Sequence, residues 1–120
     1  MDTRGVHILI DFWGCPTPLL SDTDFLKRAV IQVVKIIKAS LLDLHAYQFS
    51  AHDRGYQAGI SVFAVLKESH ISIHTYPEQH FVAIDIYSCG QTAPTLGLGY
   101  LTEKLKPNSV TFTKVIRGKN

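Results

Sequence analysis

The sequence predicts an α+β protein, a two-layer α/β sandwich in which two helices cover one face of a mostly antiparallel sheet. Segments with period-two or continuous apolar patterning outnumber the two segments with helical spacing. Strand segments follow one another between those two helices, whereas a parallel sheet needs strands and helices in alternation. The 120 residues suffice for one such core and not for two, so we expect a single domain spanning 1–120.

The first third of the chain is expected to form a strand, a turn and a long helix. Residues 6–13 are mostly apolar and predict the strand, which the glycine and two prolines of residues 14–18 end in a turn. Ser21 and Asp22 are good N-caps, and apolar residues then recur every three or four positions as far as Ile37. This spacing predicts an amphipathic helix of about 18 residues.

The middle of the chain predicts three or four strands. Residues 41–49 mostly alternate, residues 60–66 are largely apolar, and residues 81–87 form another apolar run, which ends at Ser88-Cys89-Gly90. Period two also governs residues 69–76. One face there carries His70, Ser72, His74 and Tyr76, and the other carries Ile71, Ile73 and Thr75.

A second helix and a last strand complete the expected fold. Thr92 is expected to cap the helix, with Pro94 in its first turn, and the glycines at 97 and 99 weaken its interior. Residues 109–116 predict the strand. Because two helices cover only one face of a sheet that is apolar on both, we expect the other face to pack against a second copy. The result would be a four-layer αββα homodimer.

The composition excludes several classes of protein. Twelve basic and ten acidic residues are scattered along the chain, so no nucleic-acid partner is expected. No run approaches the ~18 apolar residues of a membrane span, and no signal peptide precedes residue 6, which predicts a cytoplasmic protein without a membrane partner. Cys15 and Cys89 lack CxxC spacing, so we expect two free thiols in a reducing compartment.

A polar cluster lies between two apolar runs, at residues 67–78. It holds two acids, two serines, two histidines and a threonine within twelve residues. Buried polar groups cost free energy unless each is hydrogen-bonded, so packing gains nothing from such a cluster. The cluster therefore indicates a functional site.

The pattern around this cluster resembles a known family. It reads Glu68-Ser69-His70-x-Ser72-x-His74-Thr75-Tyr76-Pro77-Glu78, followed by Asp85 and by Ser88-Cys89-Gly90. Gly5-x-His7, Gly14-Cys15 and Arg117-Gly118 match as well. This pattern resembles the small prokaryotic form of the S-adenosylmethionine decarboxylase family, and the resemblance covers nearly the whole chain.

The resemblance implies that the protein makes its own cofactor. Ser69 would attack the carbonyl of Glu68, the resulting ester would be eliminated to dehydroalanine, and hydrolysis would leave a pyruvoyl group at position 69. The products would be a β chain, residues 1–68, and an α chain, residues 69–120. The pyruvoyl carbonyl would then form a Schiff base with a substrate amine and draw electrons as CO2 leaves.

The same resemblance assigns roles to individual residues. His74 would be the base for processing, Ser61 would assist processing, and Cys89 would donate the proton to the substrate carbon. Since Ser69 and His74 are five residues apart on one extended strand, they face opposite ways. Their contact is expected to need a bend at the cleavage site or a neighbouring strand. Taken alone, Cys15 is interpreted as a buried, inert thiol.

Substrate binding is expected from Glu78 at the ribose hydroxyls and from Phe49 and Tyr76 beside the adenine, with Asp11 nearby. Tyr76 replaces a tryptophan that is usual in the family, and Asp11 replaces a glutamate. The loop at 50–58 is longer than usual and adds His52, Asp53, Arg54 and Tyr56. The glycines at 97 and 99 replace bulkier residues, and we expect all these changes to affect specificity.

Three functions follow from this resemblance. The first is decarboxylation of S-adenosylmethionine for spermidine and polyamine synthesis. The second keeps the chemistry on a basic amino acid, arginine or ornithine, because the pocket residues are altered. The third is a non-catalytic homologue, which the presence of Ser69, His74 and Cys89 disfavours. A zinc site from His70, His74 and Cys89 is a weak alternative, and no metal is expected.

Overall fold

The computed structural model describes residues 4–51 and 58–118, which form one six-stranded antiparallel sheet and three α-helices. The strand order is β2-β3-β4-β5-β1-β6, and each neighbouring pair is antiparallel. The strands are β1 Gly5–Trp13, β2 Leu41–Phe49, β3 Gly59–Leu66, β4 Ser69–Tyr76, β5 Phe81–Cys89 and β6 Ser109–Arg117. This confirms the predicted α+β fold with an antiparallel sheet.

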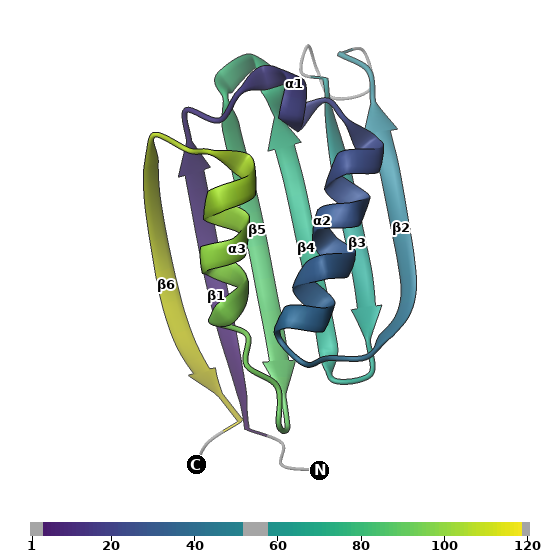
Figure 1. Cartoon of the computed structure of the whole chain (residues 1–120), viewed down its shortest axis with the longest axis vertical. Coiled ribbons are helices and arrows are strands. Elements are labelled where there is room, and N and C mark those ends of the chain that lie inside the picture. Colours follow the sequence, from purple (N-terminus) through teal and green to yellow (C-terminus); the bar gives the residue numbers. More distant parts are fainter. Residues whose placement is uncertain (1–3, 52–57, 119–120) are drawn as a thin grey trace.

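The helices all lie on one face of this sheet. They are α1 Thr17–Leu20, α2 Thr23–Ile36 and α3 Leu96–Leu105, and a 3-10 turn, η1, spans Pro77–Gln79. Figure 1 shows α2 and α3 side by side in front of the strands, with α1 at the upper end of the sheet. The β3–β4 hairpin and the end of β5 lie at the opposite, lower end. The molecule is therefore the two-layer sandwich that the sequence predicts.

The core lies between the helices and the sheet. Alternate strand residues point to the helices and are fully or almost fully buried, as the period-two pattern requires. From the sheet they include Ile8, Ile10, Phe12, Val62, Ile71, Ile73, Ile84 and Ile86, and from the helices Leu26, Val30, Val33, Leu101 and Leu105. The apolar faces of α2 and α3 thus meet a continuous apolar surface of the sheet.

The region before α2 differs from the prediction. The sequence predicts a turn followed by a helix of about 18 residues, whereas α1 occupies part of that turn and α2 has 14 residues. Pro18 fits the first turn of α1, where its missing N–H costs nothing. The buried hydroxyl of Thr75 donates to the carbonyl of Leu20 at 2.8 Å, which holds α1 on the sheet. Asp22 caps α2 as expected, accepting from the Phe25 N–H at 3.0 Å.

The start of α3 also differs. Thr92 does not cap this helix, because its hydroxyl lies 2.7 Å from Ser88 Oγ and 3.0 Å from the Cys89 carbonyl oxygen and so closes the end of β5. The helix begins at Leu96, beyond Pro94. The preceding turn is irregular, as the glycine-rich sequence suggests, and β5 runs two residues further than predicted, to Cys89.

Gly97 lies where α3 packs against the sheet and α2. A Cβ at this position would lie 2.8 Å from Ile86 Cδ1 and 3.0 Å from Val33 Cγ1, on the helix side of the sheet. A Cβ at Gly99, half a turn further along α3, would have nothing within 4 Å. The absence of a side chain at 97 lets α3 approach α2 and β5 closely.

This difference gives a paired prediction. Gly97→Ala is expected to destabilise the fold by about 1–3 kcal/mol, since an extra methyl in a packed core forces its neighbours to move. Gly99→Ala is the matched control and is expected to leave stability unchanged or raise it by up to about 1 kcal/mol through helix propensity. Urea unfolding of the two variants measures both values, and equal midpoints would contradict the assignment.

The face of the sheet opposite the helices carries a mixture of apolar and polar side chains. Leu9, Trp13, Phe63 and Val65 on this face are between 36% and 44% exposed, although they are large and apolar. Within the described residues no helix covers them. We call this surface the uncovered face.

Candidate active site

The Glu68–Ser69 peptide bond lies in a tight turn at the lower end of the sheet. Leu66 pairs with Ser69, so Lys67 and Glu68 alone connect β3 to β4. The turn is tied to the start of β2, because the Lys67 N–H donates to the Ser40 carbonyl at 2.9 Å and the Ser40 N–H donates to Glu68 Oε1 at 3.0 Å. These bonds hold the predicted cleavage site in one backbone conformation.

Cys89 lies directly against this turn. Its thiol donates to the carbonyl oxygen of Glu68, with Sγ 3.1 Å from that oxygen. The two extra residues of β5 bring it there, since they pair Cys89 with Gly5 and Ser88 with Ser69. The structure therefore brings together the hydroxyl-bearing residue, the carbonyl that it would attack and the thiol.

Ser61 and His74 form a second cluster. They are directly opposite each other on β3 and β4, and Ser61 Oγ lies 2.8 Å from His74 Nδ1. Both side chains point to the uncovered face. The resemblance assigned both residues to processing, and the structure places them in contact with each other.

The two clusters lie far apart within one chain. β4 runs without interruption from Ser69 to Tyr76, so the five residues between Ser69 and His74 span about 16 Å at a rise of about 3.3 Å per residue. The expected bend at the cleavage site is absent from this strand. The neighbouring strand β3 does not help either, since its Ser61 lies beside His74. Within one chain, the structure therefore does not bring Ser69 and His74 together.

The predicted substrate-binding residues lie near the second cluster. Asp11 pairs with Ala83, and Ala83 pairs with His74, so all three are level on the uncovered face. Tyr76 follows two residues after His74 on the same face. The four predicted residues Asp11, Phe49, Tyr76 and Glu78 thus gather at the upper end of the sheet, away from Ser69.

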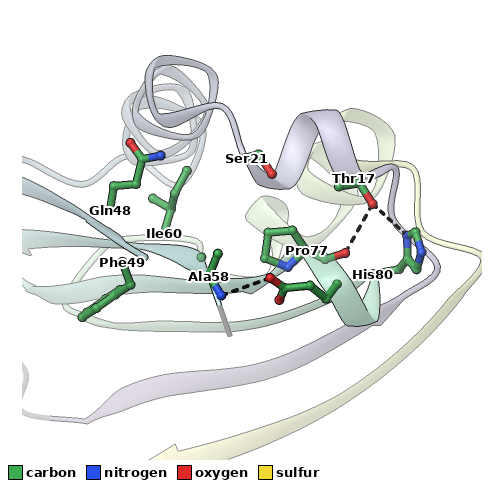
Figure 2. A pocket seen from close by; sticks show the side chains of 10 residues that line it. Thr17, Ser21, Gln48, Phe49, Ala58, Ile60, Pro77 and His80 are labelled. Atoms are coloured by element: carbon green, nitrogen blue, oxygen red, sulfur yellow. Dashed lines mark hydrogen bonds between the residues drawn. The ribbon is translucent and has the colours of Figure 1, made fainter. Parts of the chain in front are cut away.

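A cavity of about 290 Å³ opens at this upper end, between α1, the end of β2, the start of β3 and η1. Phe49 lines it together with Gln48 and Ser21, as Figure 2 shows. Glu78 also lines it. Glu78 Oε1 accepts a hydrogen bond from the Ala58 N–H at 3.1 Å, which fixes that carboxylate at the rim. The added loop residues His52, Asp53, Arg54 and Tyr56 lie outside the described residues.

A group of titratable residues to which the sequence assigned no role lies between the two clusters. His7 Nε2 is 3.1 Å from Asp85 Oδ1, and Ser72 donates to Asp85 Oδ2 at 3.4 Å. The ring of His70 stacks on Phe63, with centroids 5.5 Å apart. Burial, and then the charge of His7, lower the pKa of His70, so its imidazole is neutral near pH 7.

Sequence patterning contained a partial signal for this group, because Asp85 interrupts an otherwise apolar strand. Its partner His7 is 78 residues away, and only the β1–β5 register brings them together.

Cys15 and Cys89 are free thiols, as expected. Burial raises the pKa of Cys15 to about 11, so this thiol stays protonated and unreactive.

No group of three or more His, Cys, Asp or Glu side chains in residues 4–51 and 58–118 is arranged to hold a metal ion. His74 and Cys89 lie toward opposite ends of the sheet, which separates the members of the zinc alternative. Among the helices that the structure describes, none is long and apolar enough to cross a membrane.

Comparison with known proteins gives concordant results. Residues 6–118 match the family described as S-adenosylmethionine decarboxylase. The chain is 41% identical over 117 residues to the S-adenosylmethionine decarboxylase proenzyme 2 of Bacillus anthracis, covering 97% of this chain and 90% of that protein. It is 37% identical over 113 residues to the arginine decarboxylase proenzyme of Caldivirga maquilingensis, covering 93% and 81%. The crystal structure of the adenosylmethionine decarboxylase from Aquifex aeolicus superposes with a TM-score of 0.85 at 27% identity, covering 100% of this chain and 95% of that one.

Proposed function

The chain belongs to the S-adenosylmethionine decarboxylase family, and from this premise we propose that it is a self-cleaving, pyruvoyl-dependent decarboxylase of S-adenosylmethionine. The observation that carries the proposal is the contact between the Cys89 thiol and the Glu68 carbonyl at the turn before Ser69. The carbonyl and the weak acid are in contact there, next to the residue that carries the hydroxyl. The product, decarboxylated S-adenosylmethionine, would serve spermidine and polyamine synthesis in the cytoplasm.

The residues at the turn fit the formation of a pyruvoyl group. The Ser69 hydroxyl attacks the Glu68 carbonyl carbon, and the peptide bond becomes an ester. A base then removes the proton from Ser69 Cα, the bond between Ser69 Cβ and Oγ breaks, and the first chain leaves with Glu68 as its C-terminal carboxylate. The dehydroalanine left at position 69 tautomerises to an imine, and water hydrolyses this imine to the pyruvoyl ketone with release of ammonia. The hydrogen bond from Cys89 favours the negative charge that develops on the Glu68 oxygen during the attack.

In the finished enzyme the pyruvoyl group supplies a carbonyl that condenses with the substrate amine and accepts electrons as CO2 leaves. Cys89 remains beside position 69 and is the thiol available to return a proton to the substrate carbon. His74, paired with Ser61, is the base for processing. Glu78, Phe49, Tyr76 and Asp11 bind the adenosyl part.

We further propose that two chains build each active site. The hydroxyl and thiol of one chain lie about 16 Å along β4 from its own His74 and Ser61. When two uncovered faces pack around a twofold axis that lies between them and runs perpendicular to the strands, the lower end of each sheet meets the upper end of the other. His74 and the substrate residues of one chain then complete the site at Ser69 of its partner. The same packing buries Leu9, Phe63 and Val65 in a four-layer αββα dimer.

One specific observation favours a second substrate. The relative from Caldivirga maquilingensis, named an arginine decarboxylase proenzyme, is almost as similar to this chain as the relatives named for S-adenosylmethionine. Arginine is therefore the alternative substrate. The chemistry at Ser69 would be the same, and only the groups that hold the side chain would differ.

The purified protein can decide between these substrates. We expect intact-mass analysis to show two chains. We also expect kcat/KM, measured by 14CO2 release, to be at least about 100-fold higher for carboxyl-labelled S-adenosylmethionine than for labelled arginine or ornithine, a gap of roughly 3 kcal/mol. Release from arginine alone would overturn the substrate assignment. A single uncleaved chain of 13.4 kDa without activity would favour the non-catalytic homologue.

A further inference from the structure

Three aromatic side chains stand in one row at the upper end of the uncovered face. Trp13 on β1 pairs with Phe81 on β5, and Phe81 pairs with Tyr76 on β4. The Trp13 and Phe81 rings are stacked with centroids 4.3 Å apart, and the Phe81 and Tyr76 rings with centroids 5.5 Å apart. Both pairs are inclined by 30°. We call these three residues the aromatic row.

The spacing of the row shows how the rings are oriented. Neighbouring strands are about 4.8 Å apart, close to both centroid distances. Rings lying flat on the sheet at that spacing would overlap, so these rings stand on it and present their faces to one another. Each ring therefore limits the tilt of the next, and Tyr76, at the β4 end of the row, is supported from behind by Phe81 and Trp13.

The far end of the row is anchored by rigid backbone. The Trp13 carbonyl accepts from the Asn108 N–H at 2.8 Å, which joins the ends of β1 and β6. Gly14 follows with φ of 78°, and a Cβ there would lie 2.5 Å from Asn108 Nδ2. The chain thus turns tightly after Trp13. The indole is still 44% exposed, so packing into the core does not account for its position.

The row lies among the groups that the proposed function assigns to substrate. Asp11 precedes Trp13 by two residues and points to the same face, His74 precedes Tyr76 by two residues, and Glu78 follows Tyr76. None of these assignments includes Trp13 or Phe81. The row is therefore continuous with the proposed site, and its inner member is already a proposed contact for the substrate.

We propose that Trp13 and Phe81 are positioning residues that hold the Tyr76 ring upright as one wall of the binding site for the purine ring of the substrate. This inference rests on the proposed function and adds to it two residues, Trp13 and Phe81, that determine specificity for the purine by supporting Tyr76. A flat aromatic ligand gains from stacking only when the ring it meets is held in one orientation, because otherwise binding has to immobilise that ring as well.

The test separates a positioning role from a structural one. Phe81→Leu removes the ring that meets Tyr76, and Trp13→Leu removes the ring that holds Phe81 in place. In both variants KM for S-adenosylmethionine is expected to rise about three- to tenfold, the size of one aromatic pair, while kcat changes less than about twofold. Trp13→Phe restores a ring and is expected to bring KM within about twofold of the starting protein. Phe112→Leu is the matched control, because Phe112 is an exposed aromatic on the helix side of β6, and its KM should not change.

Binding is also measured without turnover. The ligand for this titration is 5′-methylthioadenosine, which has the purine but neither the amine nor the carboxylate of the substrate. Calorimetric titration of the cleaved enzymes should show a three- to tenfold loss of affinity in the two leucine variants, about the energy of one aromatic pair. Unchanged Kd and KM in both variants would overturn the proposal, and so would a loss confined to kcat. Failure of the unmodified enzyme to bind either this nucleoside or S-adenosylmethionine would instead refute the proposed function.

Discussion

Ser69→Ala is expected to stay a single uncleaved chain of 13.4 kDa with no detectable decarboxylation. The methyl group of alanine cannot attack the Glu68 carbonyl, so neither the ester nor the pyruvoyl group forms. The fold should persist, because the substitution removes only one oxygen atom from a half-buried residue at the start of β4. Intact-mass analysis after prolonged incubation, together with circular dichroism, measures both expectations.

Ser72→Ala is the matched control for this experiment. Ser72 is a serine of the same strand, and it hydrogen-bonds to Asp85 away from the turn. It is expected to cleave normally, although loss of its hydrogen bond costs about 1 kcal/mol of stability. Cleavage of Ser69→Ala between positions 68 and 69 would refute the proposed chemistry, and so would an intact chain that still releases CO2 from S-adenosylmethionine.

The strands and the faces of the sheet could be predicted from the sequence because their signal is local. In β4 the alternation with polar residues predicts that Ile71, Ile73 and Thr75 are buried, and the structure confirms it, although Ser72 on the other face is buried as well. α1 and the start of α3 could not be predicted in the same way. Their positions depend on tertiary hydrogen bonds of Thr75 and Thr92, which no sequence window contains.

The candidate site was harder to predict for a related reason. The polar residues from 67 to 78 are close in sequence and suggest one cluster, but an extended strand carries Ser69 and His74 apart by about 3.3 Å for each residue. Contacts that depend on strand register, such as Cys89 with Glu68, join residues 21 apart. Register follows from the whole set of strand pairings, so pairwise spacing in the sequence does not show it.

The separation of Ser69 from His74 leads to a second prediction with a large effect. His74→Ala alone is expected to abolish cleavage, as Ser69→Ala does, since the base that removes the Cα proton is lost. A dimer that contains one chain of each variant is different. It has one site in which the intact Ser69 of the first chain faces the intact His74 of the second, and one site that lacks both groups.

Co-expression of the two variants in equal amounts should therefore restore cleavage to the His74→Ala chains only. Random pairing puts about half of those chains into mixed dimers, so about half are expected to be cleaved. Isotopic labelling of one variant identifies the cleaved chain by mass. As a control, the double variant co-expressed with either single variant should stay uncleaved, because no pairing then unites Ser69 with His74.

Complete absence of cleavage in the 1:1 mixture, with mixed dimers present by native mass, would show that each chain must supply its own His74. The regular course of β4 argues against that outcome. To bring His74 to its own Ser69, a chain would have to break strand pairings at both residues. Ser69 pairs with Leu66 and Ser88, and His74 pairs with Ser61 and Ala83.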